Sequence, residues 1–314
     1  MDINYVEFLA AAVQAGTPLL FATLGESITE KSGNLNLGVE GMMLMGAVVG
    51  FQVGLFTQNP LLALAGAMIA GAAGALIFAF LTVTLRANQV VSGLSLTIFG
   101  TGFSGFLGQK MVEHRTFDQM KTPEGVSRFF KPLEIPILDD IPVLGRIIFH
   151  QDVFVLLGFL SAIAIGLYLY NTRKGLNLRV VGENPSVADA AGINVSLYKY
   201  VHILLGGALC GLGGAYLSLV YVPSWQENIT AGRGWIAVAL VIFTTWNPYR
   251  AILGSFVFGG LDILGFYWKV LDQKILSMLP YAVTIIVLIF ISMTKSKENS
   301  PPQGLGVPYF REDR

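Results

Sequence analysis

The chain has 314 residues, of which 54% are hydrophobic and 13% charged, with 20 basic and 20 acidic side chains. A soluble domain carries roughly 25% charged residues, so this composition excludes an ordinary soluble protein, and the mean hydropathy of +0.63 indicates a membrane protein. The zero net charge provides no overall field for nucleic acid, and a single cysteine, Cys210, excludes an internal disulfide framework.

A helix needs about 20 apolar residues to cross the hydrocarbon of a bilayer. The segments that meet or approach this length are 5–24, 38–57, 61–85, 88–109, 153–170, 199–222, 234–246, 251–268 and 276–294. We therefore predict an all-α, polytopic transmembrane bundle of about nine spans, within a range of eight to ten, as one transmembrane domain over residues 1–294. Residues 295–314 read as a polar, disordered tail.

The basic residues of the short loops set the orientation, because Lys and Arg are enriched on the cytoplasmic side. Placing the basic loop 171–198 inside also places Lys31, Arg86 and Arg250 inside. The first eight residues carry two acids and no base, as an outer N-terminus should. We expect the N-terminus outside and the C-terminus in the cytoplasm.

Residues 25–41, GESITEKSGNLNLGVEG, are too polar for an ordinary span and too glycine-rich for a stable helix. We expect a broken helix here, and a second short or broken helix near 234–246. Intramembrane polar groups usually face a cavity or one another, so Asn34, Asn36 and Glu40 are candidates to line a solute path. For Glu30 and Lys31, at the membrane boundary, we favour a place in interfacial water.

The span 88–109 carries a polar stripe at roughly helical spacing. Its members are Asn88, Ser92, Ser95 and Ser104, with Gln89, Thr97 and Thr101 nearby. Such side chains commonly bond neighbouring helices in membranes; the alternative is a face that binds a polar solute. Phe99 could stack on a ring of that solute, although aromatic residues at this spacing are more often core. The following segment, 110–152, is the one long extracytoplasmic loop, either a solvated connector or a docking surface for an external partner.

The loop 171–198, NTRKGLNLRVVGENPSVADAAGINVSLY, contains a capped helix at 186–191. Either Ser186 is the cap, or Asn184 is the cap with Pro185 at the first helical position. Gly192 fits the position just past the helix end. A plain connector needs no capped, alanine-rich helix, whereas small side chains let another protein's groove close over it. We therefore expect a protein-docking helix.

Two further features admit simpler explanations. Glycines at GxxxG spacing, Gly46, Gly50, Gly54, Gly207 and Gly211, indicate close helix packing. The lone acid of its span, Asp262, is compatible with a solute or proton site and with a bond to a neighbouring helix. The sequence has no G-x-x-x-x-G-K-[ST], H-E-x-x-H or G-x-S-x-G motif and no metal-ligand spacing, so we predict no catalytic or metal residues and no cofactor bound by this chain.

Three segments carry a family resemblance: LGESITEKSGNLNLGVEGMMLMGA, NQVVSGLSLTIFGTG and GLNLRVVGENPSVADAAGINV. They resemble the ribose and branched-chain amino-acid type of ABC importer permease, and within it the nucleoside, or simple-sugar-like, branch. The resemblance covers about residues 15–295. It implies a multi-pass permease, not an enzyme, in a prokaryotic cell membrane. Its expected partners are an ABC ATPase that binds ATP and Mg, a second permease subunit, usually a different homologue, and an extracytoplasmic substrate-binding lipoprotein.

Carried over residue by residue, the resemblance implies that 182–192 is the coupling helix seated in the ATPase groove. The coupling residues would be Gly182, Glu183, Asn184, Pro185, Ser186, Ala188, Asp189, Ala191 and Gly192. The residues inferred to line the path of a nucleoside or related sugar are Asn34, Asn36, Glu40, Asn88, Gln89, Ser92 and Phe99. The competing hypothesis is an ion-coupled secondary transporter that uses Glu40 or Asp262, although no inverted repeat is evident.

Overall fold

The structure is a computed structural model that describes residues 5–113, 120–132, 141, 145–267, 276, 278–293 and 300–311. Over these residues the chain is a helical bundle, which confirms the predicted fold class, and each of the nine apolar segments contains a helix. Within the described ranges, seven helices are long and apolar enough to cross a membrane. They are α1 (Tyr5–Lys31), α2 (Val39–Thr57), α3 (Pro60–Ala79) with its π-helical end η1 (Phe80–Thr84), α4 (Gln89–Val112), α6 (Val153–Asn171), α9 (Val195–Tyr216) with its π-helical end η4 (Leu217–Tyr221), and α11 (Pro248–Tyr267).

The other two apolar segments form shorter helices, α10 (Arg233–Phe243) and α13 (Leu279–Met293). The 11 residues of α10 extend about 16 Å, roughly half the thickness of the hydrocarbon. The short helix expected near 234–246 is therefore confirmed, while the count of nine crossings stays a prediction.

Most helix starts follow from local capping chemistry. An Asn side chain accepts a backbone N–H of the first turn in four helices, at Asn59, Asn88, Asn184 and Asn194. Such a cap satisfies one of the N–H groups that a helix start leaves without an intrahelical partner.

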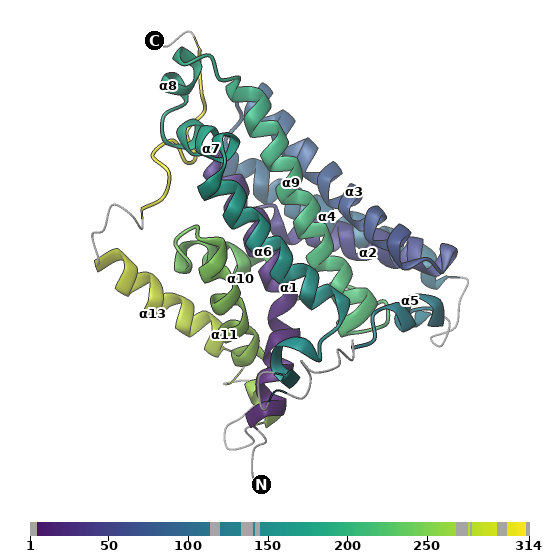
Figure 1. Cartoon of the computed structure of the whole chain (residues 1–314). Helices are drawn as coiled ribbons and strands as arrows, with labels where there is room; N and C mark the ends of the chain where they lie inside the picture. Colours follow the sequence, from purple (N-terminus) through teal and green to yellow (C-terminus); the bar gives the residue numbers. More distant parts are fainter. Residues whose placement is uncertain are drawn as a thin grey trace.

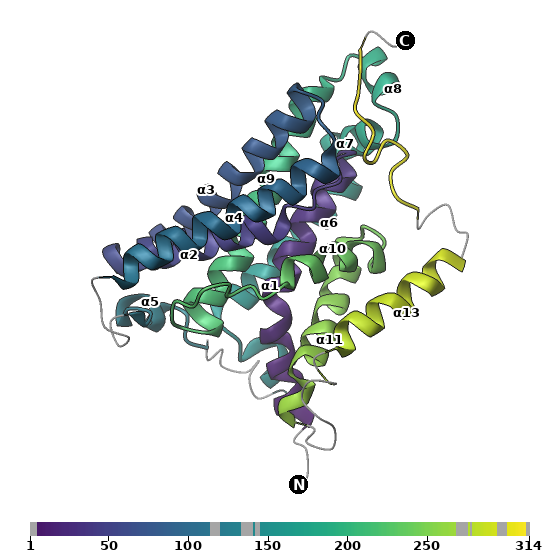
Figure 2. The same cartoon turned by 180° about the vertical axis from the view of Figure 1, so that it is seen from behind.

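The helices form two groups around α1 (Figures 1 and 2). On one side α2, α3, α4 and α9 pack together, and on the other α10 and α11 pack with α13; α1 contacts α9 of the first group and α10 and α11 of the second. The N-terminus and the C-terminal segment lie at opposite ends of the molecule (Figure 1). The placement of the two termini on opposite sides of the membrane stays a prediction.

Glycines bring the helices of the first group into backbone contact. A Cβ atom added to Gly46 of α2 would overlap the backbone of Gly211 of α9, and one added to Gly71 of α3 would overlap Gly207. Small residues allow this close approach where lipid provides no hydrophobic drive for helix association. The interpretation of the GxxxG glycines as packing faces is confirmed for Gly46, Gly207 and Gly211.

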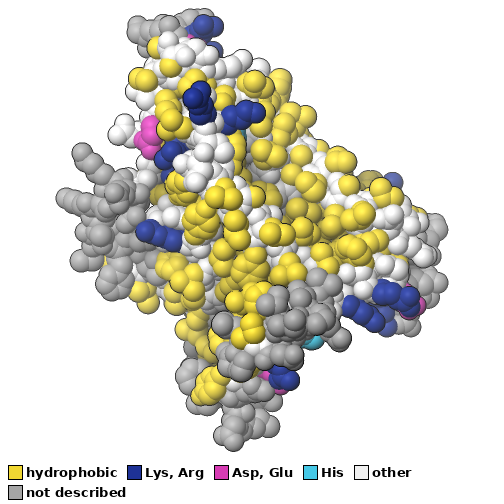
Figure 3. Space-filling view, viewed as in Figure 1, with side chains coloured by type: hydrophobic (Ala, Val, Ile, Leu, Met, Phe, Trp, Pro, Cys, Tyr) yellow, Lys and Arg dark blue, Asp and Glu magenta, His cyan; other side chains and the backbone are white. Residues whose placement is uncertain are grey.

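The outer surface of the bundle is apolar where lipid would lie. Exposed large side chains of α6 and α9 include Leu160, Ile163, Leu167, Val201 and Leu205. Figure 3 shows hydrophobic side chains over most of the middle of this face. A contiguous apolar surface of this kind is typical of a multi-pass membrane protein.

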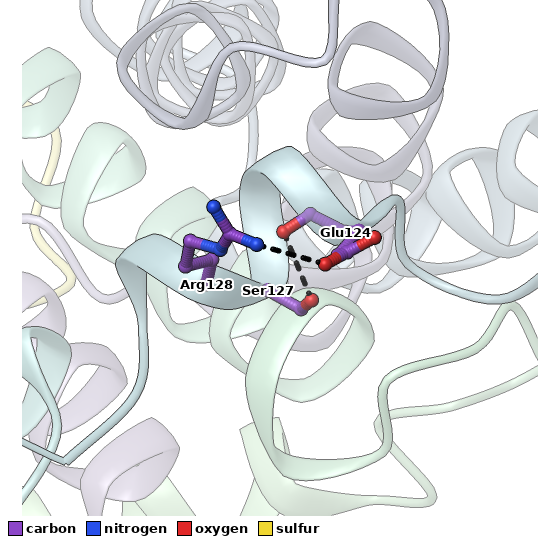
Figure 4. Close-up of polar contacts among 3 residues, drawn as sticks. All are labelled: Glu124, Ser127 and Arg128. Atoms are coloured by element: carbon purple, nitrogen blue, oxygen red, sulfur yellow. Dashed lines mark hydrogen bonds and ion pairs between the residues drawn. The ribbon is translucent and has the colours of Figure 1, made fainter.

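The described part of the long loop 110–152 packs against the bundle. Its helix α5 (Glu124–Phe129) buries Val126 completely, and the backbone of Lys121 pairs with Ser224 in an antiparallel bridge. The exposed side of α5 carries an ion pair between Glu124 and Arg128 at 3.0 Å (Figure 4). With both side chains mostly exposed, this pair contributes little stability.

The helix break expected within 25–41 is confirmed, but it is confined to 32–38, and residues 25–31 belong to α1, where Gly25 lets the backbone of Gly206 approach closely. Two other local predictions are wrong. The basic segment after α6 is a helix, α7 (Arg173–Glu183), whose N-cap is Thr172. Residues 300–311 are ordered against the bundle instead of forming a disordered tail, because their backbone is hydrogen-bonded to distant segments.

Candidate functional site

The non-helical connector at residues 32–38 joins α1 to α2 and is largely buried. Buried backbone groups need partners, above all inside a membrane. The N–H of Leu35 donates to Gln89 Oε1 at 2.7 Å, and the N–H of Asn36 donates to Glu26 Oε1 at 3.0 Å. Thr97 of α4 donates its hydroxyl to the carbonyl of Leu37 at 2.9 Å. Side chains of α1 and α4 thus hold the connector in place.

The carboxylate of Glu40, at the start of α2, caps α10. Its Oε1 accepts from the Thr230 hydroxyl at 2.5 Å and from the Gly232 N–H at 2.8 Å. Its Oε2 accepts from the Gly234 N–H at 2.6 Å. The N-terminus of a helix carries a partial positive charge, so a carboxylate there is favoured, and three donors compensate its burial.

The predicted solute-path residues fall into two groups. Five of them are between 0% and 6% exposed: Asn34, Asn36, Glu40, Gln89 and Ser92. They gather around the connector, where Asn34 Nδ2 and Gln89 Nε2 are buried without a hydrogen-bond partner among the described residues. Asn88 caps α4, and Phe99 is 50% exposed and stacks on Phe103 at 6.1 Å between ring centroids. Contact of these residues with solute stays a prediction.

Two other side-chain pairs bind α10 to its neighbours. Arg233, its first residue, pairs with Asp262 of α11 at 2.7 Å, which favours the interpretation of Asp262 as a partner for a neighbouring helix. Just beyond the other end of α10, the indole N–H of Trp246 donates to the Glu30 carboxylate of α1. Trp246 is 3% exposed, so Glu30 has a buried partner within the protein.

The predicted docking helix is α8 (Pro185–Ala190). Asn184 caps it by accepting the Val187 N–H at 3.1 Å, with Pro185 at the first position, so the second capping alternative is confirmed. Gly192 follows with φ of +80°, a left-handed conformation that favours glycine.

One face of α8 is turned to the protein and the other is exposed. Ala188 is fully buried and packs with Val181 and Val195. The exposed members of the predicted coupling set are Glu183, Asn184, Ser186, Ala191 and Gly192; Pro185 and Asp189 are half-buried, and Gly182 is buried. Sequence reasoning missed Val187, which is 55% exposed and is the largest apolar side chain on the outward face. Val187 is the larger of two neighbouring apolar residues in a helix that can bury only one face, and this pattern could have indicated its outward position.

The tail, residues 300–311, lies against α7 and α8. The N–H of Gly304 donates to the Gly182 carbonyl at 2.9 Å, and that of Gly306 donates to the Gly33 carbonyl at 3.3 Å. The Tyr309 hydroxyl donates to Asp189 Oδ2 at 3.0 Å. The tail therefore joins the docking helix to the connector, a relationship that the sequence signals of either segment alone could not reveal.

Comparison with known proteins identifies the class. Residues 8–288 match the family described as the branched-chain amino acid transport system, permease component. The chain belongs to this family. It is thus the permease component of an ABC transporter, a transport subunit and not an enzyme.

Three relatives resemble the permease over nearly their whole length. TsgC13 of Haloferax volcanii, provisionally named as a glucose ABC transporter permease, is 37% identical, with 97% of both chains covered. The nucleoside ABC transporter permease NupC of Lactococcus lactis is 36% identical over 91% of this chain and 92% of its own. The guanosine ABC transporter permease NupQ of Bacillus subtilis is 34% identical, with 100% of both covered.

The resemblance inferred from the sequence is therefore confirmed, and an ion-coupled carrier is not favoured. As an ABC permease the chain is a multi-pass membrane protein that works with ABC partner subunits.

Proposed function

We propose that the permease imports nucleosides across a prokaryotic cell membrane, with a related simple sugar as the second candidate. Two relatives named for nucleoside or guanosine transport, at 36% and 34% identity, support the nucleoside assignment. The relative named for glucose, at 37% identity, supports the alternative. In this proposal the N-terminus is extracytoplasmic and α8 is cytoplasmic.

The observation that carries the proposed coupling mechanism is the outward face of α8. A short helix with a complete N-cap presents Val187 among small neighbours, which a groove on a partner ATPase can enclose. The inward face is fixed by Ala188 and by the tail. Movement of the ATPase groove would therefore be transmitted to α7, α9 and the connector as a unit.

The solute pathway would lie between this chain and a second, homologous permease subunit. The face of α4 that includes Phe99 supports this assignment, because it is exposed here and combines stacked aromatic rings with the hydroxyl of Thr101. A nucleoside base can stack on such a ring. The buried polar cluster around Glu40 would then position α4 and α10 on either side of the path.

An extracytoplasmic lipoprotein would deliver the solute at the end of the bundle opposite α8. The charged outer side of α5 supports this docking place, since Glu124 and Arg128 are exposed there on a helix packed firmly on the bundle. A fixed and charged surface can orient a partner that approaches from solution.

The deciding experiment is uptake in a host that lacks endogenous nucleoside transport. The permease is expressed with the ATPase, second permease and lipoprotein of its source organism, and uptake of labelled guanosine, uridine, ribose and glucose is measured. We expect ATP-dependent nucleoside uptake that disappears when residues 182–192 are deleted, while membrane insertion persists. Uptake of glucose but not of nucleosides would reassign the solute. Transport by the purified chain alone, driven by an ion gradient, would contradict the coupling mechanism.

A further inference from the structure

A cavity of about 430 Å³ lies beside α8, between the end of η1, the start of α9 and the tail. We call it the tail cavity. Its charged and polar lining includes Arg86, Asp189, Asn194, Lys199, Tyr309 and Arg311. A volume in this range suits a small-molecule ligand. The cavity lies apart from the connector and from Phe99, so the proposed solute path does not account for it.

Basic side chains outnumber acidic ones among the described residues that line the tail cavity. Among the described residues that line it, the one acidic side chain is Asp189, which is already engaged: Arg311 approaches its Oδ2 to 3.3 Å, and the Tyr309 hydroxyl donates to the same oxygen. Arg86 stacks on the ring of Phe310 at 4.6 Å from its centroid, and this contact brings no negative charge. Over the described residues the cavity therefore keeps an excess of positive charge.

The strongest indication of a ligand is Lys199, on the second turn of α9. It lines the cavity and is only 4% exposed, yet its side chain has no hydrogen-bond or ion-pair partner among the described residues. A Lys side chain so enclosed is costly without a counter-charge, and such groups are normally paired with an anion or accepted by polar neighbours. A negatively charged ligand in the cavity would supply that partner.

The start of α9 adds to the same preference. Asn194, Val195 and Ser196 line the cavity, so the N-terminus of a 22-residue helix lies at its wall. The positive end of a helix and its unpaired N–H groups favour anions, phosphate above all. A guanidinium, an ammonium and a helix N-terminus together form a donor set that suits the several oxygens of a phosphoryl group.

We propose that the tail cavity binds a phosphoryl anion, through Lys199, Arg86 and the N-terminus of α9, with Arg311 closing the site from the tail. The source of the phosphoryl group is either the headgroup of an anionic phospholipid or a free phosphorylated metabolite. Because Arg311 and Tyr309 also hold Asp189, binding fastens the tail to α8.

The test uses the full-length permease in nanodiscs of phosphatidylcholine. One arm titrates inorganic phosphate and AMP, with adenosine as the ligand that lacks a phosphate, and follows binding by equilibrium dialysis. The other adds phosphatidylglycerol and counts retained lipids by native mass spectrometry. We expect saturable binding in at least one arm, which also identifies the source, and protection of the tail from limited proteolysis at saturation.

Variants link that binding to the cavity. Lys199→Met removes the ammonium group but keeps an apolar stem, so it should fold without loss of thermal stability and weaken binding by about tenfold or more. Arg311→Gln lies on the exposed tail, where it leaves the bundle intact, and should also weaken binding. The control is Lys174→Gln, an exposed base on α7 outside the cavity. Absence of binding in both arms, or binding unchanged by Lys199→Met and Arg311→Gln, would overturn the proposal.

Discussion

Glu40 accepts a hydrogen bond from the backbone N–H of Gly234 at 2.6 Å, and a Cβ atom added to Gly234 would lie 2.6 Å from the same carboxylate oxygen. The start of α10 is thus fastened to the start of α2 at a point where no larger residue fits. This contact, together with the connector, fixes the short helix α10 relative to the rest of the bundle.

Replacement of Glu40 by Ala should destabilise the permease. The change leaves the Thr230, Gly232 and Gly234 donors without their acceptor, and each unsatisfied buried donor costs about 1–3 kcal/mol. The measurement is thermal unfolding of the purified protein in detergent. Glu124→Ala, on the exposed face of α5, is the control and should leave the midpoint unchanged; equal midpoints for both variants would show that the cap is dispensable.

Substitution of Gly46 by Ala should disrupt packing between α2 and α9, because the added methyl group overlaps the backbone of Gly211. We expect a loss of about 1–3 kcal/mol, the usual cost of overpacking. Gly102→Ala is the matched control: it is also a helical glycine, but no atom lies within 4 Å of its added Cβ. It should be neutral or slightly stabilising. A ranking in the opposite order, by thermal unfolding, would contradict the role assigned to Gly46.

Val187→Asp should abolish ATP-dependent transport without preventing membrane insertion. The charge would be placed on the outward face of α8, where the proposed ATPase groove would have to desolvate it. Co-purification of the ATPase with a tagged permease measures docking directly. The control is Val112→Asp, at the C-terminal end of α4. The side chain of Val112 is 49% exposed, close to the 55% of Val187. Retention of the ATPase by the Val187 variant would exclude α8 as the main docking element.

Phe99→Ala should raise the KM for nucleoside uptake by about tenfold, because stacking of a base on an aromatic ring is worth about 1–3 kcal/mol. The maximal rate should change less, since the residue contributes binding surface only. The comparison is Ile98→Ala, at the preceding residue of α4, whose side chain is 74% exposed against 50% for Phe99. An unchanged KM in the Phe99 variant would place that face of α4 against lipid.

Asp262→Asn separates a structural role from a proton site. The residue pairs with Arg233 at 2.7 Å, so removal of its charge should lower thermal stability, and the double variant Arg233→Gln/Asp262→Asn should recover part of the loss. ATP-dependent uptake should persist in both. Loss of transport in both variants, with normal stability, would instead support a proton-transfer role for Asp262.

Local signals predicted the elements that depend on neighbouring residues. Asn184, Pro185 and Gly192 define the start and end of α8 within nine residues of sequence, because capping is a local interaction. The apolar segments likewise located the membrane helices, since hydropathy and length are sufficient to identify them.

The errors have a common cause, which is contact between distant segments. Gly25 suggested a helix break, yet it is needed for close approach to Gly206. The composition of the tail suggested disorder, yet Gly304 and Gly306 bond to residues more than 100 positions away. The polar residues of the connector gave no sign that the side chains of Gln89 and Glu26 accept hydrogen bonds from its backbone. No single-sequence pattern encodes such pairings.

The meeting of Gly33, Gly182 and Gly304 has a consequence for biogenesis. The tail bonds to the carbonyls of both earlier glycines, and it is synthesised after every membrane helix described here. A ribosome that stalls before residue 300 would release a chain whose helices can insert but whose α8 lacks the hydrogen bonds to the tail. Assembly of the transporter could therefore discriminate finished from unfinished permeases at the step of ATPase recruitment, without a separate quality-control factor.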